Sequence, residues 1–341
     1  MKKKVKEAIL IFSILILSIF AILYLSFSER QEIFKKVCGD GTLEGDCSIN
    51  KPYFCFNKTL IENSQFCDCP DVLIKKEDSC FSKYQTGSKE VELNYILRGE
   101  EGKIKFILYK GLLDYIEKLP KTISYSSGQK PSRQDFKFKK IDEPQQRELL
   151  LPLVVKLQNN FDEIDQARVA VSIVQNLNYG GSGRNITLGA NYVNYSRYPY
   201  EVLYDLEGAC ESKSELLAFL LRELGYGVVL FYYPIEKHEV VGVKCPEKYG
   251  LNNTGYCFIE TTGPSIISND EEYYSGLGKL SSSPEILFIS EGKSLGDNLY
   301  EYKDAEDFIR LSRIVQDTGE LNIFRHNRFK ELKEKYGLNH I

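Results

Sequence analysis

The distribution of cysteine constrains this chain more than any other feature. Of nine cysteines, six lie close together, two flank one polar loop and one stands apart. The six are Cys38, Cys47, Cys55, Cys67, Cys69 and Cys80; the flanking pair is Cys245 and Cys257, and the remaining one is Cys210. We expect three disulfides among the six, with fifteen connectivities possible, and a fourth across the loop. Bridges in this number require an oxidising compartment.

The N-terminus has the features of a segment that directs a protein to such a compartment. Residues 1–7 are basic, and residues 8–27 form an uncharged apolar run. A helix of about 20 residues spans the roughly 30 Å hydrocarbon core of a bilayer, and the run has no small-x-small cleavage site. We therefore expect a retained, single-pass anchor in the cell membrane, with a cytoplasmic N-terminus and an extracytoplasmic C-terminal domain. Four N-glycosylation sequons agree with that topology: Asn57, Asn185, Asn194 and Asn252.

Composition and charge exclude several kinds of function. The chain carries 44 basic and 48 acidic residues, and no basic patch occurs beyond its extreme N-terminus, so we expect no nucleic-acid partner. A glycine-rich phosphate loop is missing, and we expect no cofactor. The histidines are only His238, His326 and His340, and the cysteine cluster lacks paired C-x-x-C spacing. A metal site is therefore not expected.

The chain divides into five parts. They are 1–27, the basic end and anchor; 28–88, a disulfide-rich stalk; 89–150, an accessory region of hairpin and helix; 151–300, the main domain; and 301–341, a helical tail. The stalk is too small to hold a core unaided, so bridges replace the core. We interpret it as a rigid spacer, with a small recognition module as the alternative. The tail is expected to pack back on the domain; the alternative is an exposed partner helix.

Hydrophobic periodicity predicts an α+β architecture. A hairpin is expected over 89–109 with its turn at 98–102, and helices over 112–119, 143–159, 162–179 and 304–336. Strands are expected over 228–233, 239–243 and 256–261. Helices come early and strands late, which favours helices packed on a segregated antiparallel sheet.

Cys210 opens a strongly amphipathic helix. The stretch GACESKSELLAFLLRELGYG places Leu216, Leu217, Leu220, Leu221 and Leu224 on one apolar face, and glycines end the helix. A thiol at a helix N-terminus faces unpaired backbone N–H groups and the positive end of the helix dipole. Both favour the thiolate, which is the nucleophilic form. Cys210 is therefore a candidate nucleophile; the alternative is a buried structural cysteine.

A histidine and a carboxylate follow this cysteine. His238 lies in EKHEVVGVK and Glu260 in YCFIETT, each within a strand-like apolar run. This is the order of a nucleophile, its base and the group that orients the base. A buried carboxylate needs a partner, which for Glu260 is either His238 or a lysine or arginine elsewhere. Tyr198 and Tyr200 precede the cysteine, and we expect them to pack at the surface rather than line the cleft.

These residues resemble the transglutaminase-like superfamily, whose core has the papain-like cysteine proteinase fold. The family pattern is a helix ending in an aromatic residue, a Gly-x-Cys that opens a long helix, a histidine strand and a carboxylate strand. The corresponding stretches are QARVAVSIVQNLNY, GACESKSELLAFLLRELGYG, HEVVGV and FIETT, within residues 162–264. The anchor and stalk look like those of membrane-bound archaeal members. The resemblance implies that Cys210 is the nucleophile, His238 the base and Glu260 the orienting acid.

Two departures from the family concern Glu260. The family usually has aspartate at this position, although carboxylates of either length orient histidine in other triads. In addition, a regular hairpin with Cys245 opposite Cys257 would pair His238 with Pro264 instead of Glu260. A bulge or loose loop ends must then absorb the offset.

Three functions are compatible with this set of residues. The first is an extracytoplasmic thiol hydrolase, which cleaves peptide or isopeptide amides of a protein or peptide substrate through a thioester. The second is a cross-linking acyl transferase, which passes the same thioester to an amine. The third is a catalytically silent envelope module that keeps the fold for binding or structure. The triad favours the first two, and its oxyanion hole is expected to include the backbone N–H of Cys210.

Overall fold

The computed structural model describes residues 15–22, 37–126, 128, 130–181, 185–188, 191–271 and 279–338. Residues 15–22 are helical, and the rest of the apolar run at 8–27 lies outside the described residues. Within the described part of the chain, no helix is both long and apolar enough to cross a membrane.

A bridge-rich unit occupies residues 37–82. Its disulfides join Cys38 to Cys55, Cys47 to Cys67 and Cys69 to Cys80. A fourth joins Cys245 to Cys257, so the predicted four bridges form and Cys210 stays reduced. The elements of the unit are β1 (Tyr53–Phe56), β2 (Thr59–Glu62), α2 (Ser64–Cys67), β3 (Ile74–Lys76) and β4 (Ser79–Phe81). They form two short antiparallel hairpins, β1–β2 and β3–β4.

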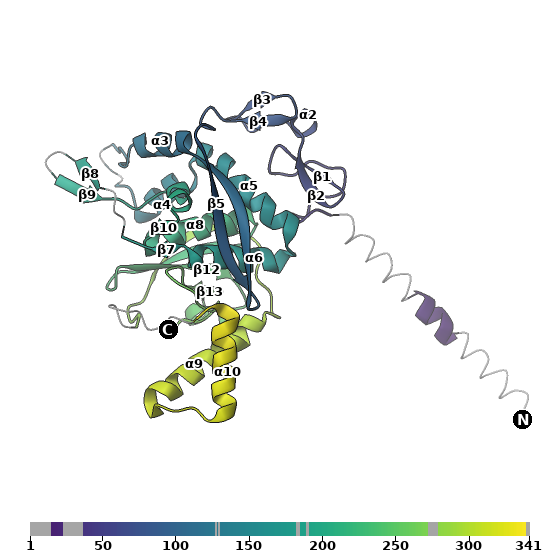
Figure 1. Cartoon of the computed structure of the whole chain (residues 1–341), viewed down its shortest axis with the longest axis vertical. Coiled ribbons are helices and arrows are strands. Elements are labelled where there is room, and N and C mark those ends of the chain that lie inside the picture. Colours follow the sequence, from purple (N-terminus) through teal and green to yellow (C-terminus); the bar gives the residue numbers. More distant parts are fainter. Residues whose placement is uncertain are drawn as a thin grey trace, which may run out of the picture.

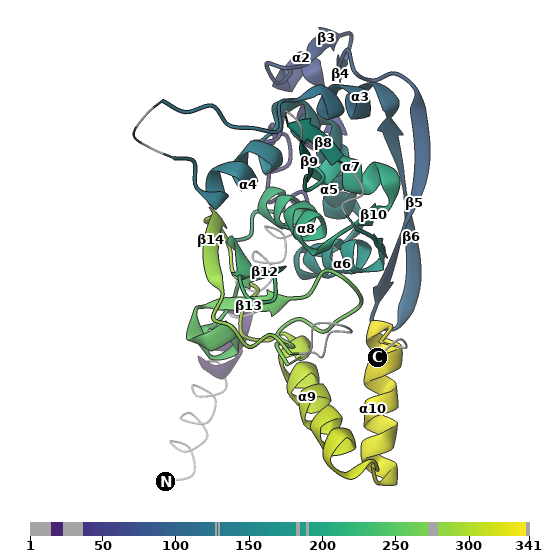
Figure 2. The same ribbon diagram turned by 90° about the vertical axis from the view of Figure 1, so that its left-hand side faces the viewer.

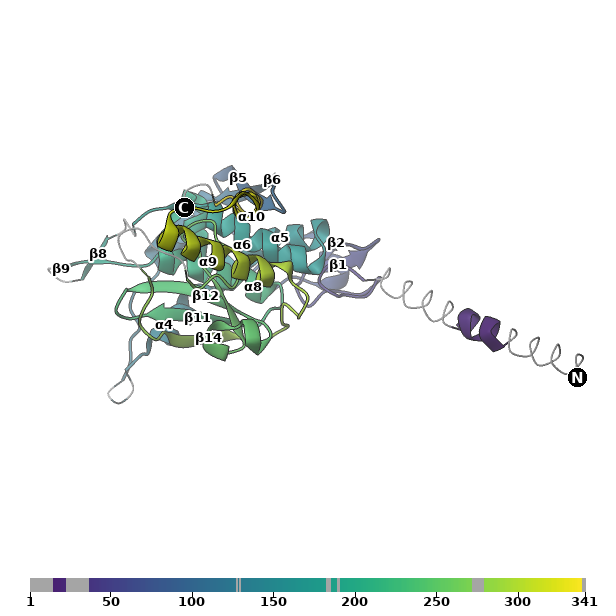
Figure 3. The ribbon, with the colours of Figure 1, turned by 90° about the horizontal axis from the view of Figure 1, so that it is seen from below.

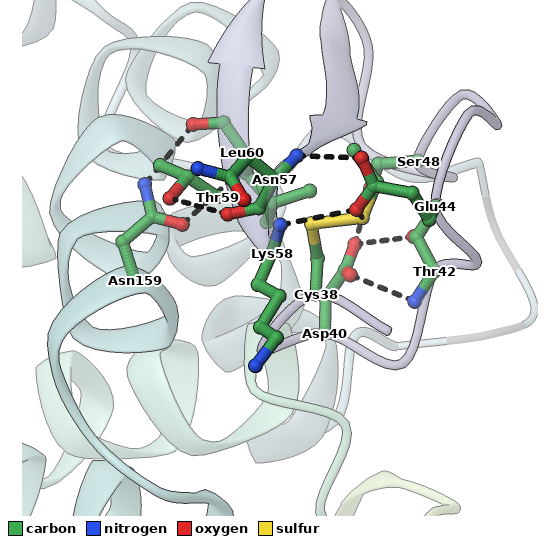
Figure 4. The surroundings of a disulfide bond; sticks show 11 residues. Cys38, Asp40, Thr42, Glu44, Ser48, Asn57, Lys58, Thr59, Leu60 and Asn159 are labelled. Atoms are coloured by element: carbon green, nitrogen blue, oxygen red, sulfur yellow. Dashed lines mark hydrogen bonds between the residues drawn. A yellow bond between two sulfur atoms is a disulfide. The ribbon is translucent and has the colours of Figure 1, made fainter. Parts of the chain in front are cut away.

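The bridge-rich unit is packed on the helical body. The side chain of Asn159 accepts a hydrogen bond from the Leu60 backbone N–H at 2.8 Å and donates one to the Leu60 carbonyl at 3.0 Å (Figure 4). Tyr53, Leu60 and the Cys38–Cys55 bridge belong to the same buried cluster as the helices. The unit therefore shares its core with the domain that follows it.

Helices between residues 110 and 223 form the body of the domain. They are α3 (Lys110–Lys118), α4 (Arg133–Ile141), α5 (Pro144–Asn160), α6 (Glu163–Asn176), α7 (Pro199–Asp205) and α8 (Cys210–Glu223). Local sequence sets their limits: Ser132 and Asp135 form a capping box before α4, and Pro144 starts α5. The leucines of α8 are buried, and Gly225, with a φ of 87°, follows its last turn.

A long hairpin of β5 (Ser88–Leu97) and β6 (Glu100–Tyr109) packs on α6. The predicted turn at 98–102 is wrong, because Leu97 already pairs with Glu100 and only Arg98 and Gly99 form the turn. Both have positive φ, 56° and 85°. Such a turn matches the right-handed twist of the flanking strands, so the pairing continues to the last residue on each side.

The main sheet is antiparallel, in the order β13–β12–β11–β14. Its strands are β11 (Val228–Tyr233), β12 (His238–Lys244), β13 (Tyr256–Ile259) and β14 (Glu285–Ser290). Short 3₁₀ turns, Glu247–Tyr249 and Leu251–Asn253, join β12 to β13. The first three strands match the predicted ones closely, whereas β14 was not predicted. It pairs with β11 at the open edge of the sheet.

Sheet, helices and hairpin form layers (Figures 2 and 3). The sheet packs on α8, α8 packs on α6, and β5 covers α6 on the far side. The main core lies between these layers. A smaller cluster, formed by Val229, Phe231, Tyr233, Val240, Leu251 and Phe258, covers the other face of the sheet. The fold is thus α+β, as predicted. Two further hairpin strands, β8 (Asn185–Leu188) and β9 (Asn191–Asn194), extend from the body (Figure 1).

The helical tail expected over 304–336 is a hairpin of two helices. α9 (Tyr300–Thr318) ends at Gly319, which has a φ of 73°, and the Asn322 side chain caps α10 (Ile323–Tyr336). α10 returns to contact β5 (Figures 1 and 2). The tail therefore packs back on the domain, and the left-handed glycine reverses its direction.

Candidate active site

Cys210 lies at the first position of α8, directly after a short strand. That strand, β10 (Glu207–Gly208), pairs in parallel with β7 (Asn178–Tyr179), which follows α6. Gly208 permits the close approach, since a Cβ there would lie 3.1–3.3 Å from the side chains of Lys213 and Val202. The helix cap is Ala209, which has no side-chain acceptor for the first-turn N–H groups. The free thiol of Cys210, which is half-buried, therefore lies where helix N–H groups point outward.

His238 begins β12, and Glu260 directly follows β13. The Nε2 atom of His238 lies 2.9 Å from Oε2 of Glu260, and both side chains are buried. The register pairs Val241 with Ile259, so its continuation places Glu260 opposite Val240. His238 is thus the diagonal neighbour of Glu260 on the same face of the hairpin, within reach of a long side chain.

The disulfide explains why the expected pairing of His238 with Pro264 does not occur. Cys257 pairs with Val243 and not with Cys245, so the bridge from Cys245 to Cys257 crosses the hairpin diagonally. The pairing of these strands is regular, without a bulge, from Val241–Ile259 to Lys244–Tyr256. Because the bridge is diagonal, the register differs from the expected one. The side chain of Glu260, which is longer than that of an aspartate, covers the remaining distance to His238.

Both oxygens of Glu260 are hydrogen-bonded. Oε2 binds His238, and Oε1 accepts from the Thr261 N–H at 2.9 Å and from the N–H and Oγ1 of Thr262, each at 2.7 Å. Burial by itself would raise the pKa of Glu260, but the hydrogen bonds from His238 and Thr262 and the charge of His238 hold it below its usual value. Glu260 is therefore a fixed carboxylate aimed at the imidazole.

The structure brings Cys210 to the same histidine. Burial alone would lower the pKa of His238, but its hydrogen bonds with Cys210 and Glu260 raise that pKa to about 10. Glu260 occupies Nε2, which leaves Nδ1 of the imidazole for the thiol. The three residues picked from the sequence thus form one chain of contacts, from thiol to imidazole to carboxylate.

Tyr179 lies beside this triad and was given no role from the sequence. It is the aromatic residue that ends QARVAVSIVQNLNY, and it pairs with Gly208 across β7 and β10. Burial and the charges of Cys210 and Glu260 raise the pKa of its phenol, although its side chain is 63% exposed. Its phenol therefore lies within the electrostatic reach of the thiol and the carboxylate, at the surface of the site.

Lys213 is a second residue that the sequence did not single out. It lies one turn into α8, is fully buried, and donates to the carbonyls of Leu177 at 2.8 Å, Thr262 at 3.2 Å and Gln175 at 3.4 Å. Burial lowers its pKa to about 8, and the charge of Glu260 opposes that shift. Lys213 thereby joins three segments, which carry Tyr179, Glu260 and Cys210.

A buried cluster of charged side chains lies next to the triad. The ammonium of Lys137, which is 1% exposed, contacts Glu211 at 2.5 Å, Glu215 at 2.8 Å and Glu239 at 2.9 Å. Lys140 also binds Glu215. Glu211 follows Cys210 in the chain and Glu239 follows His238, so Lys137 of α4 connects α8 to β12. We call this set the Lys137 cluster.

The other residues predicted from the sequence lie on other segments of the chain. Asn57 and Asn252 are exposed in turns, whereas the side chains of Asn185 and Asn194 lie outside the described part of the structure. Tyr198 and Tyr200 are buried and not at the surface, because the Tyr200 hydroxyl bonds the backbone of Tyr109 and Tyr198 packs into the core. Among the described residues, no group of three or more His, Cys, Asp or Glu side chains could hold a metal ion.

Comparison with known proteins adds no relative: no family model matches the chain, and no curated protein is significantly similar to it.

Proposed function

We propose that this chain is a transglutaminase-like thiol hydrolase that cleaves peptide or isopeptide amides through a thioester on Cys210. The observation that carries the proposal is the contact chain itself: a reduced cysteine at a helix start, hydrogen-bonded to a buried histidine whose other nitrogen is 2.9 Å from a carboxylate. This is the arrangement of an activated nucleophile, its base and an orienting acid.

The reaction follows from these contacts. His238 takes the thiol proton of Cys210 at Nδ1, and the thiolate attacks the carbonyl carbon of the substrate amide. The backbone N–H of Cys210 donates to the oxyanion of the tetrahedral intermediate. His238 then returns the proton to the leaving amine, the C–N bond breaks and a thioester remains. Water, deprotonated by His238, attacks the thioester and releases the acid and the thiol.

The raised pKa of His238 fits the first step. A more basic imidazole favours transfer of the Cys210 proton to His238, and the imidazolium that results forms a charged pair with Glu260. Glu260 is held by Thr261 and Thr262, so it keeps the imidazole in one orientation during both proton transfers. Lys213 positions the carbonyls around the site but does not touch the reacting atoms.

We also propose that residues 8–27 anchor the protein in the cell membrane with the catalytic domain outside. The four disulfides support an oxidising compartment, since such bridges are rare in reducing cytosol. The expected substrate is then an extracytoplasmic protein or peptide.

A thiol-directed electrophile tests this function. The purified ectodomain is labelled with iodoacetamide at neutral pH, and the modified cysteine is identified by mass mapping. We expect labelling at Cys210 that slows by about 10²-fold or more in His238→Ala, because general acid–base groups contribute roughly 10²–10⁴-fold. The matched control is His326→Ala, which removes an exposed histidine on α10.

The result distinguishes a catalytic cysteine from one that merely reacts with electrophiles. Equal, slow labelling of the wild type and His238→Ala, with circular dichroism showing both folded, would remove the basis of the catalytic proposal. In that case the chain is the silent module. Adding a primary amine to a turnover assay distinguishes hydrolysis from acyl transfer, because a transferase yields the amide product of that amine.

A further inference from the structure

A cavity lies beside the nucleophile and outside the triad. It has a volume of about 360 Å³ and is bounded by α4, by residues 195–198 and by Glu211 in the first turn of α8. Ser196 and Arg197 both contact Ser212, through an Oγ–Oγ distance of 3.2 Å and a backbone N–H at 3.1 Å. The lining therefore includes Glu211, the residue next to Cys210 in the first turn of α8.

The lining of this cavity is basic. Five of its side chains are cationic and one is anionic, although the whole chain has more acidic than basic residues. They are Lys121, Arg133, Lys137, Lys139, Lys140 and Glu211. A cleft lined by one sign of charge focuses the field and concentrates ligands of the other sign.

Only part of this charge is balanced within the walls. Lys137 and Lys140 bind the carboxylates of the Lys137 cluster, and Arg133 lies 3.7 Å from Glu285. Lys139 instead donates to the Thr122 carbonyl, a neutral dipole, and burial lowers the pKa of its ammonium. A carboxylate beside Lys139 would supply the counter-charge that a carbonyl does not.

The walls also provide apolar surface. The ammonium of Lys121 lies 4.5 Å from the ring centroids of both Tyr195 and Tyr198, and Phe136 is partly exposed in the cavity. The volume is at the lower end of the roughly 300–1,000 Å³ of small-ligand sites. It suits one or two residues of a chain with an aliphatic stem and an anionic end.

We infer that this cavity is a substrate subsite that takes an acidic residue of the polypeptide acylating Cys210. The inference rests on the proposed function, and it names the substrate class as acidic peptides. The carboxylate of that residue would lie at Lys139, its stem against Phe136 and Tyr195, and the backbone would run along the first turn of α8 toward the thiol.

Two peptidyl vinyl sulfones that differ only in a glutamate against a glutamine next to the electrophile test this subsite. In the wild type we expect the glutamate probe to label Cys210 about tenfold faster, because a hydrogen bond to a charged group is at stake. The preference should shrink as salt rises, since the lining is partly exposed. The quantity compared is the ratio of the two rates, so a general loss of reactivity cancels.

Lys139→Glu should bring that ratio to one or below, and Lys139→Gln should reduce it. The matched control is Lys303→Glu, the same charge reversal on an exposed site of α9, far from α4 (Figure 2), and it should keep the wild-type ratio. A wild-type ratio of one overturns the subsite. If labelling in that case still depends on His238, the proposed function is unaffected. A preference that survives Lys139→Glu also overturns it. Loss of His238 dependence removes the proposed function instead.

Discussion

Two buried sets of charged groups share the same helix and strand but differ in construction. Cys210 and His238 belong to the triad, while their neighbours Glu211 and Glu239 belong to the Lys137 cluster. The triad contains a single carboxylate, Glu260, and a thiol that is half-buried. The cluster contains three carboxylates and two lysines, with most of its groups sealed from solvent.

The two sets also differ in where their contacts lead. In the triad the polar contacts link Glu260 and His238 to the thiol of Cys210, which is half-buried. In the Lys137 cluster the contacts join three elements, α4, α8 and β12, and meet at the ammonium of Lys137, which is 1% exposed. Substitutions in the triad should change the rate of amide turnover. Substitutions in the Lys137 cluster should change stability and the relative placement of Cys210 and His238.

The largest effect is expected from Cys210→Ala. Amide turnover by the ectodomain should fall to the level of the buffer, because the acyl acceptor is gone. The unfolding midpoint in guanidinium should stay close to that of the wild type, since the side chain is small and half-buried. Residual turnover above background in this variant would contradict the role of Cys210.

Lys137→Met should have the largest effect on stability. It leaves Glu215 and Glu239 buried without their main counter-charge, and breaking such a pair costs about 3–5 kcal/mol. Lys140→Met, which removes one contact to Glu215 only, is the matched control and should cost less. Guanidinium unfolding measures both. If Lys137→Met were as stable as the wild type, the cluster would not hold the three elements together.

Glu260→Gln should reduce turnover by less than the roughly 10²–10⁴-fold of a lost acid–base group. The nucleophile and base remain, and only the orienting charge is lost. Glu260→Asp keeps the charge and should retain more turnover than Glu260→Gln. Rates are measured per folded molecule. If Glu260→Gln lowered only stability and left that rate unchanged, Glu260 would be a structural carboxylate and the site a Cys210–His238 dyad.

The smallest expected effect is a difference between the pH ranges over which Glu239 and His238 change the stability of the protein. Burial raises the pKa of Glu239 from 4.5 to about 7, and hydrogen bonds with Cys210 and Glu260, against burial, raise that of His238 from 6.5 to about 10. Both groups bind a proton more tightly when folded, so each contributes stability that falls as pH rises through its folded pKa. The free energy of unfolding of the wild type relative to Glu239→Gln should therefore decline between pH 4.5 and 7.

The same measurement against His238→Gln should decline later, between pH 6.5 and 10. Urea titrations at half-unit pH steps report both differences. Coincident windows would mean that the two sets of groups titrate as one and are not separate units.

Much of the fold and of the triad was predictable because it depends on local signals. Each of these signals spans only a few helical turns or one strand. They are the leucine spacing of α8, the odd cysteine and the alternation in β11 and β12. The order of Cys210, His238 and Glu260 followed from three such stretches. The turn at Arg98 and Gly99 and the break at Gly319 were missed because their backbone conformation depends on pairing and packing that composition does not reveal.

The sequence by itself determined which cysteine stays reduced, where the helix that starts at Cys210 begins and that His238 and Glu260 follow it in two strand-like stretches. Only the tertiary structure decided the Lys137 cluster, which joins residues 74 to 102 positions apart. It also decided the diagonal reach of Glu260 and the carbonyl contacts of Lys213. The physical reason is that the sequence does not distinguish a buried lysine or glutamate from a solvated one. Its environment is set by long-range packing, whereas helix periodicity and caps are set by neighbours in the chain.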